Sequence, residues 1–260
     1  MSQYKAIVIA AGIGKRLRPL TDELPKCMLE VGGRTLLQSC VDNFRACDIH
    51  DIAVVTGYAA DKISYPNLTY YHNPDYLNNN TLHSLMYARK ALEDALEKEQ
   101  SVILSYSDIW LSNKVLPVLI DSQYEISIMI DKMWEKQYEG RTDNPISDAE
   151  LAVFSIENQL QRIGKKSVWS QEEQVGEFLG LMMLRPSGIQ NFLHHFDTLE
   201  KRMQASSTFQ KATSWQQSHL SDFLQDLTDQ GYTIKCVPTP MQLAWREFDT
   251  VQDFKRGLPK

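Results

Sequence analysis

The sequence predicts an α/β protein built around a largely buried sheet. In the first half of the chain, short apolar segments at 5–11, 51–57 and 101–108 alternate with segments at 35–47 and 81–99 that have the spacing or composition of helices. Apolar runs of this length are typical of buried strands, and their alternation with helices is typical of a parallel sheet. The chain of 260 residues, 43% of them hydrophobic, is long enough for one sizeable core.

The remaining elements are expected in a less regular order. One more short strand is expected at 68–72 in the first half. The second half is expected to hold strands at 125–131, 151–156, 177–184 and 232–238, a polar loop at 138–150, and helices at 187–204 and 217–230, the latter ending at Gly231. Because no repeat, low-complexity segment or linker interrupts the chain, we expect a single domain over residues 1–260.

The composition narrows the class of protein. The net charge of −6 argues against nonspecific binding to nucleic acid or to an anionic membrane surface, and no apolar span reaches the length of a membrane helix. The four cysteines form no C-x-x-C pair and lack the spacing of a zinc site. With no secretory leader in the N-terminal sequence, we expect a cytoplasmic protein. The sequence leaves a homodimer open.

The most specific local feature is the stretch AAGIGKRLRPLTDELPK at residues 10–26, directly after the first expected strand. A glycine loop in this position is typical of phosphate binding. A dinucleotide fingerprint is excluded because Leu17 stands at the third glycine position and the second strand ends in TGY, without an acid for a ribose hydroxyl. A P-loop is excluded because its first glycine position holds Ile9 and because Lys15 is followed by Arg16.

The whole stretch instead favours the binding of a nucleoside triphosphate. Gly12 and Gly14 let backbone N–H groups approach phosphates closely, and Arg16 and Lys26 add positive charge. Phosphoryl transfer depends mainly on positioning and on charge neutralisation, which these groups can supply. The alternative is a tight turn with solvated basic residues. The string G-x-G-x-R-L-R-P-L-T-x3-P-K is much more specific than a turn requires.

This stretch, continued through CMLEVGGRTLLQ, resembles the signature of the nucleotidyltransferases that activate sugar phosphates and phosphocholine. The resemblance implies a glycosyltransferase-A-like fold with a mixed sheet, and the joining of a nucleoside monophosphate to an acceptor phosphate with release of pyrophosphate. It implies a nucleotide-binding part at about 1–122 and an acceptor-binding, metal-completing part at about 123–260.

The resemblance also implies roles for residues of the loop. The backbone around Ala11, Gly12 and Gly14 would hold the base and the phosphates. Arg16 would grip the triphosphate, and Lys26 would lie between the α-phosphate and the acceptor phosphate.

Two acids are candidates for a magnesium site. Asp108 ends an expected strand, at the edge where open α/β sheets bind ligands, and Mg²⁺ usually takes one or two carboxylates plus phosphate oxygens. The family often has D-x-D here, but Tyr106 replaces the first acid. Asp249, in WREFDTVQDF, resembles the late aspartate that completes the metal site in the family. The alternatives are a turn or cap for Asp108 and a helix N-cap for Asp249.

Base contacts are expected from residues 73–85, which resemble the corresponding segment of the phosphocholine cytidylyltransferases. Asn80 offers the donor and the acceptor that the edge of cytosine requires, and Ser84 is a second candidate. The alternative for Asn80 is that it caps the following helix.

The acceptor is expected to bind near residues 131–150, which combine acids, aromatic residues and Arg141. An aromatic ring beside an acid suits an alkylammonium group, and an arginine suits a phosphate or phosphonate. The stretch also resembles the cytidylyltransferases of phosphonate and phosphocholine tailoring. The alternative is a surface hairpin with a buried tryptophan and an ion pair. The acceptor-binding candidates are Asp131, Trp134, Tyr138, Arg141, Glu177 and Trp245.

These observations together predict a magnesium-dependent cytidylyltransferase. Its substrates would be CTP and a small phosphate or phosphonate bearing an amine, such as 2-aminoethylphosphonate or phosphocholine. One alternative is a sugar-1-phosphate nucleotidyltransferase that uses UTP, dTTP or GTP. Another is a catalytically silent nucleotide-binding relative, which the missing first acid of D-x-D leaves open.

Overall fold

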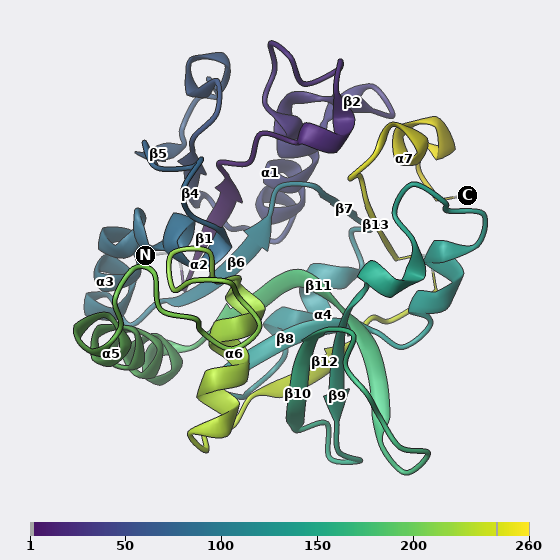
Figure 1. Cartoon of the computed structure of the whole chain (residues 1–260). Helices are drawn as coiled ribbons and strands as arrows, with labels where there is room; N and C mark the ends of the chain where they lie inside the picture. Colours follow the sequence, from purple (N-terminus) through teal and green to yellow (C-terminus); the bar gives the residue numbers. More distant parts are fainter. Residues whose placement is uncertain (1–2, 243, 260) are drawn as a thin grey trace.

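The computed structural model describes residues 3–242 and 244–259, and its centre is a nine-stranded mixed sheet (Figure 1). Its main path runs β10-β9-β11-β6-β1-β4-β5, with β8 beside β11 and β12 beside β8. The strands of this sheet are β1 Tyr4–Ala10, β4 Asp51–Thr56, β5 Thr69–His72, β6 Ser101–Tyr106, β8 Ile126–Asp131, β9 Glu150–Phe154, β10 Leu160–Lys165, β11 Gln174–Leu184 and β12 Lys235–Pro238. Two small two-stranded sheets pair β2 Glu30–Val31 with β3 Arg34–Thr35 and β7 Ile109–Leu111 with β13 Trp245–Glu247.

The helices cover both faces of the large sheet. The α-helices are α1 Leu36–Ala46, α2 Thr81–Met86, α3 Arg89–Glu97, α4 Val115–Ile120, α5 Pro186–Arg202, α6 Leu220–Asp229 and α7 Val251–Arg256. Short 3₁₀ turns are η1 Lys15–Leu17, η2 Lys26–Met28, η3 Ala60–Lys62, η4 Trp134–Tyr138 and η5 Ile146–Asp148. Figure 1 shows α3 and α5 beside each other at one side of the molecule, and α7 near β13 at the other.

The central strand β1 shows why the sheet is buried on both faces. Its alternate residues Ile7 and Ile9 belong to a core formed with α2, α3, α5 and α6. Ala6 and Val8 belong to a second core formed with α1 and α4. Because successive strand residues point to opposite faces, an uninterrupted apolar run serves both cores at once. The fold is therefore a three-layer arrangement of helices, sheet and helices.

The predicted fold class is confirmed by the strand directions. Strand β1 pairs parallel with β4 and with β6, and β4 pairs parallel with β5. The alternation of strands and helices in the first half predicts these directions. The sheet changes direction at β11, which pairs antiparallel with β6, β8 and β9. The sheet is thus mixed: β1, β4, β5 and β6 form one parallel part, and β8 and β12 form a second parallel pair.

Some local expectations need correction. The helix expected at 81–99 is two helices, because the backbone N–H groups of Tyr87 and Ala88 bond three residues back, to Ser84 and Leu85, and so interrupt the α-helical ladder. The break lets α3 turn toward α5, where Arg89 forms an ion pair with Asp197. Among the strands and α-helices, the sequence analysis did not predict β2, β3, β7, α4, β10 and β13.

The fold brings distant segments to one edge of the sheet. The glycine loop follows β1, and Asp108 follows β6, so both lie at the carboxyl ends of neighbouring parallel strands. The antiparallel pairing of β13 with β7, in which Glu247 lies opposite Ile109, returns the late segment 245–249 to the same edge. Within the described residues, no helix has the length and apolar character needed to cross a membrane.

Candidate active site

The glycine loop leaves β1 and forms the floor of a cavity. Ala11 is buried, whereas a Cβ added at Gly12 would meet no atom within 4 Å. Both residues line the cavity. Gly14 has a φ of +68° in the left-handed region, and a Cβ there would lie 3.1 Å from the Cβ of Lys26. A glycine at position 14 therefore lets the loop turn and lets Lys26 approach it, while Gly12 leaves open space beside the backbone.

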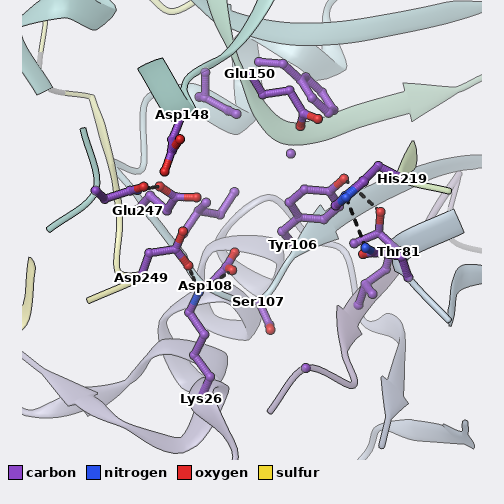
Figure 2. A pocket seen from close by; sticks show the side chains of 18 of the residues that line it. Lys26, Thr81, Tyr106, Ser107, Asp108, Asp148, Glu150, His219, Glu247 and Asp249 are labelled. Carbon is purple, nitrogen blue, oxygen red and sulfur yellow. Dashed lines mark hydrogen bonds and ion pairs between the residues drawn. The ribbon is translucent and has the colours of Figure 1, made fainter. Parts of the chain in front are cut away.

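Lys26 is the centre of a charged cluster at this floor (Figure 2). Its Nζ donates to Asp108 Oδ2 at 2.6 Å and also to the carboxylate of Asp249. Arg16 donates to the other oxygen of Asp249 and to Asn144 Oδ1 at 3.0 Å. Only 8% of Lys26 is exposed, whereas about half of the Arg16 side chain is exposed to solvent. The four charged residues that the sequence singled out in this region thus lie together.

The electrostatics of the cluster keep Lys26 charged. Burial alone would lower its pKa, but the adjacent Asp108 and Asp249 carboxylates outweigh that effect and raise the pKa above the usual lysine value. Burial would likewise raise the pKa of Asp249, but Lys26 and Arg16 hold it well below its usual range. Burial, with Asp249 and Asp108 nearby, raises the pKa of Glu247 well above its usual value.

The position of Asp249 depends on the cap of the last helix. The D-T-V-Q-D-F pattern does form a capping box, but Thr250 is the N-cap: its Oγ1 accepts from the Asp253 backbone N–H at 3.3 Å. The Asp253 carboxylate accepts from the Thr250 backbone N–H at 2.9 Å. Because its neighbour caps the helix, Asp249 keeps its carboxylate for Lys26 and Arg16.

The two residues expected to contact the base line the cavity but already have partners. Asn80 Oδ1 accepts from the Thr81 backbone N–H at 2.9 Å, so Asn80 is the N-cap of α2. Its Nδ2 lies 3.1 Å from His219 Nε2. The Ser84 hydroxyl accepts from Asn73 Nδ2 at 2.9 Å. The capping interpretation of Asn80 is therefore correct, and Asn80 borders the cavity as well.

The structure divides the six acceptor-binding candidates. Tyr138, Glu177 and Trp245 line the cavity. The other three are held by the protein away from its lining. Asp131 accepts from the Met133 backbone N–H at 2.8 Å and from Trp245 Nε1 at 2.9 Å.

Trp134 and Arg141, like Asp131, are acceptor-binding candidates that do not line the cavity. Trp134 is buried in a small core with Tyr138 and with residues that flank the start of β9. The Arg141 guanidinium binds Asp253 from Nε at 2.7 Å and from Nη2 at 3.0 Å, and its Nη2 also binds Glu247 at 3.0 Å. Its donors are therefore engaged by two carboxylates, which ties the loop after η4 to α7.

Three acids that the sequence analysis did not select also line the cavity: Asp148, Glu150 and Glu247. Figure 2 shows Asp148 and Glu247 beyond Asp249, and Glu150 across the cavity from Lys26. Asp148 and Glu150 stand two residues apart in DAE, and Glu247 stands two residues from Asp249 in EFD, a spacing that places side chains on one face of an extended segment. That spacing is the signal that could have identified them.

Tyr106, which occupies the first position of the expected D-x-D, also lines the cavity. Its ring packs against Gly180, where an added Cβ would lie 2.2 Å from a ring carbon. Its hydroxyl lies 3.4 Å from Thr81 Oγ1. The missing acid is thus replaced by an aromatic wall, and Gly180 in β11 provides the space for it.

Comparisons with known proteins show which proteins this chain is similar to. Residues 6–132 match the family model described as a MobA-like NTP transferase domain. A CTP:phosphoglutamine cytidylyltransferase of Campylobacter jejuni is 26% identical over 98% of this chain and 99% of its own length. A 2-aminoethylphosphonate cytidylyltransferase of Lancefieldella rimae is 31% identical over 34% of this chain and 38% of its own. The solved structure of a CTP:phosphocholine cytidylyltransferase from Streptococcus pneumoniae superposes with a TM-score of 0.71, at 16% identity, over 98% of this chain and 97% of that one.

Proposed function

We propose that this chain, whose residues 6–132 match a MobA-like NTP transferase domain, transfers the cytidylyl group of CTP to a small amine-bearing phosphate or phosphonate. The observation that carries the proposal is the placement of Lys26 between Asp108 and Asp249, beside the glycine loop. The cytidylyltransferase names of the relatives support CTP as the donor.

The reaction is an in-line displacement at phosphorus. An oxygen of the acceptor phosphate or phosphonate attacks the α-phosphorus of CTP and forms the new P–O bond. The bond from the α-phosphorus to the bridging oxygen breaks, and pyrophosphate leaves with that electron pair. The acceptor is an anion near neutral pH, so no general base is needed. The product is CDP-linked from a phosphate and CMP-linked from a phosphonate.

The protein's part in this reaction is to position two anions and to offset their charge. Lys26, already charged and buried, would lie between the α-phosphate and the acceptor and reduce their repulsion. Arg16, more exposed, would contact the triphosphate and stabilise the charge that develops on pyrophosphate. The open space beside Gly12 would admit the nucleotide close to the loop backbone.

The donor set at the floor of the cavity fits magnesium. Asp108 and Asp249 both bind the same nitrogen, so their carboxylates converge, and Mg²⁺ commonly takes one or two carboxylates. Among residues 3–242 and 244–259, no three His, Cys, Asp or Glu side chains form a ready-made metal cage. A magnesium ion here would therefore take its remaining ligands from phosphate oxygens and water, and when bound it would offset phosphate charge.

The cavity wall opposite Lys26 supports an amine on the acceptor. Glu150 and Glu177 contribute carboxylates there, and Tyr106, Tyr138 and Phe178 line the same cavity with aromatic rings. Carboxylates and ring faces together suit an organic cation. We call Glu150 and Glu177 the acidic wall. An acceptor whose phosphorus group lies at Lys26 would place its amine at this wall.

The test is pyrophosphate release with magnesium, in a matrix of nucleotides and acceptors. CTP, UTP, dTTP, GTP and ATP are each combined with phosphoglutamine, 2-aminoethylphosphonate, phosphoethanolamine, phosphocholine and glucose-1-phosphate. We expect release only with CTP and an amine-bearing acceptor, with the cytidylylated product identified by mass spectrometry. Chelation of the metal by EDTA is expected to stop release, and added Mg²⁺ to restore it.

Two outcomes would contradict the proposal. Release with glucose-1-phosphate and another nucleotide would replace it with a sugar-phosphate nucleotidyltransferase. Folded protein that binds CTP but releases no pyrophosphate with any acceptor would favour a catalytically silent relative.

A further inference from the structure

Glu177 is a carboxylate placed inside the sheet at the acidic wall of the cavity. It lies in β11 between two neighbouring strands, opposite Asp131 of β8 and Leu151 of β9. Only 4% of the residue is exposed, and it lines the cavity. A glutamate in the middle of a buried strand is unusual, since burying a carboxylate is costly unless its oxygens are bonded.

One oxygen of this carboxylate has no hydrogen-bond partner. Glu177 Oε1 accepts from the hydroxyl of Tyr138, whereas Oε2 is buried and receives no bond from the described residues. Most buried polar atoms in native proteins have a partner, so an unpaired carboxylate oxygen beside a cavity indicates a missing donor.

The surrounding charges show what kind of donor is missing. Asp131 and Glu150 both add negative charge around Glu177. The positive charge of Arg141 favours the ionised form of Glu177, but the guanidinium itself is bonded to Asp253 and Glu247. This part of the cavity therefore has an excess of negative charge. A positively charged donor would offset that charge and would also give Glu177 Oε2 a hydrogen-bond partner.

We propose that Glu177 selects acceptors with a protonated primary ammonium by accepting one of its N–H groups at Oε2. The terminal torsion of a glutamate is soft, so a rotation of the carboxylate can bring this oxygen to the cavity without moving the strand. A trimethylammonium group carries the same charge but has no N–H, so it would leave the oxygen unpaired. This inference rests on the proposed cytidylyl transfer and specifies the acceptor for that reaction.

The experiment compares acceptors that differ only in the methyl groups on nitrogen. Pyrophosphate release with CTP and Mg²⁺ is measured for phosphoethanolamine against phosphocholine, and for 2-aminoethylphosphonate against its N,N,N-trimethyl analogue. We expect kcat/KM to favour the primary ammonium in each pair by about 100-fold or more, because a site built to bond an N–H rejects an analogue that lacks it.

The variant Glu177→Gln tests whether this residue is the cause. Its side chain has nearly the same shape but no charge, so the preference in each pair is expected to fall to within about tenfold, mainly through a higher KM for the primary amine. The matched control is Glu172→Gln, which removes an exposed acid from the segment that precedes β11. It should leave the preference unchanged.

The outcomes separate this inference from the function on which it rests. Equal or better use of the quaternary acceptors by the wild-type protein would overturn the selection of primary ammonium and leave cytidylyl transfer standing. An unchanged preference in folded Glu177→Gln would overturn the role of Glu177. Transfer to glucose-1-phosphate alone would overturn both proposals.

Discussion

Lys26 and Glu177 are both buried ionisable residues that line one cavity, but within the described part of the chain only the charge of Lys26 is paired with side chains of opposite charge within hydrogen-bonding distance. Lys26 has two carboxylates within hydrogen-bonding distance, and its pKa is raised above the usual lysine value despite burial. Glu177 has one tyrosine hydroxyl and an unpaired oxygen, and burial raises its pKa to about 8. The floor of the cavity is thus charged before any ligand binds, whereas the acidic wall lacks a partner that a ligand can supply.

We call the Lys26 cluster the compensated side of the cavity, because its charges are paired, and the wall around Glu177 the uncompensated side. The largest expected effect is on the compensated side. Lys26→Ala should lower kcat for pyrophosphate release by about 1,000-fold or more, since cationic groups that stabilise the transition state of phosphoryl transfer contribute on this scale. Steady-state kinetics with saturating CTP measures the change, and circular dichroism confirms the fold.

A second buried lysine provides the matched control for this variant. Lys5, at the start of β1, pairs with Asp51 at 2.6 Å and is about as buried as Lys26, but it does not line the cavity. Lys5→Ala should therefore lower stability and leave kcat within about threefold. A similar loss of kcat in both variants would mean that Lys26 acts through stability rather than through chemistry.

A smaller effect is expected on the uncompensated side, in stability. The raised pKa of Glu177 means that the folded state holds its proton to higher pH than the unfolded state, so ionisation costs stability as the pH rises from about 4.5, the ordinary glutamate value, to about 8. Asp131 and Glu150 oppose the charge, and Arg141 and the Tyr138 hydroxyl favour it. The free energy of unfolding of Glu177→Gln, relative to that of the wild type, should therefore be about 2–4 kcal/mol higher at pH 9 than at pH 5.

Chemical denaturation at the two pH values measures this difference between the variant and the wild type. Glu172→Gln serves again as the exposed control, with no expected pH-dependent difference. An equal effect of Glu177→Gln at both pH values would mean that another group compensates the Glu177 charge in the folded protein.

The smallest expected effect concerns Arg16, whose side chain is half exposed at the edge of the compensated cluster. Arg16→Lys keeps the charge but loses the planar fork that bonds Asp249 and Asn144 together. We expect kcat/KM for CTP to fall about tenfold, or about 1.4 kcal/mol. Arg18→Lys is the control, because Arg18 forms an exposed ion pair with Asp22, at 3.4 Å, and does not line the cavity. Equal effects of the two variants would remove Arg16 from the site.

The compensated side was largely predictable from sequence, and the uncompensated side was not. The glycine loop and Lys26 lie in one contiguous stretch, and Asp108 ends a strand whose apolar pattern is plain. The fold class follows from the same patterns. Asp249 required the resemblance to a family, because only the pairing of β13 with β7 brings it to Asp108.

Sequence reasoning was least successful where a residue's role depends on its distant neighbours. Arg141 looks like an anion-binding residue until Asp253 and Glu247 are seen to bind its guanidinium. Glu177 was selected, but its unpaired oxygen depends on three strands packed side by side, which local spacing does not reveal. Asn80 illustrates a true ambiguity, because the same side chain caps a helix and borders the cavity.

The pairing of β13 with β7 also has a consequence for synthesis of the chain. Translation proceeds from the N-terminus, so the glycine loop, Lys26 and Asp108 leave the ribosome well before Asp249. Until residues 245–247 form their short sheet with β7, the nascent chain has one of the two carboxylates that bind Lys26. The growing polypeptide therefore acquires its complete charged cluster only after all nine strands of the large sheet have been made, because the last of them, β12, ends at Pro238.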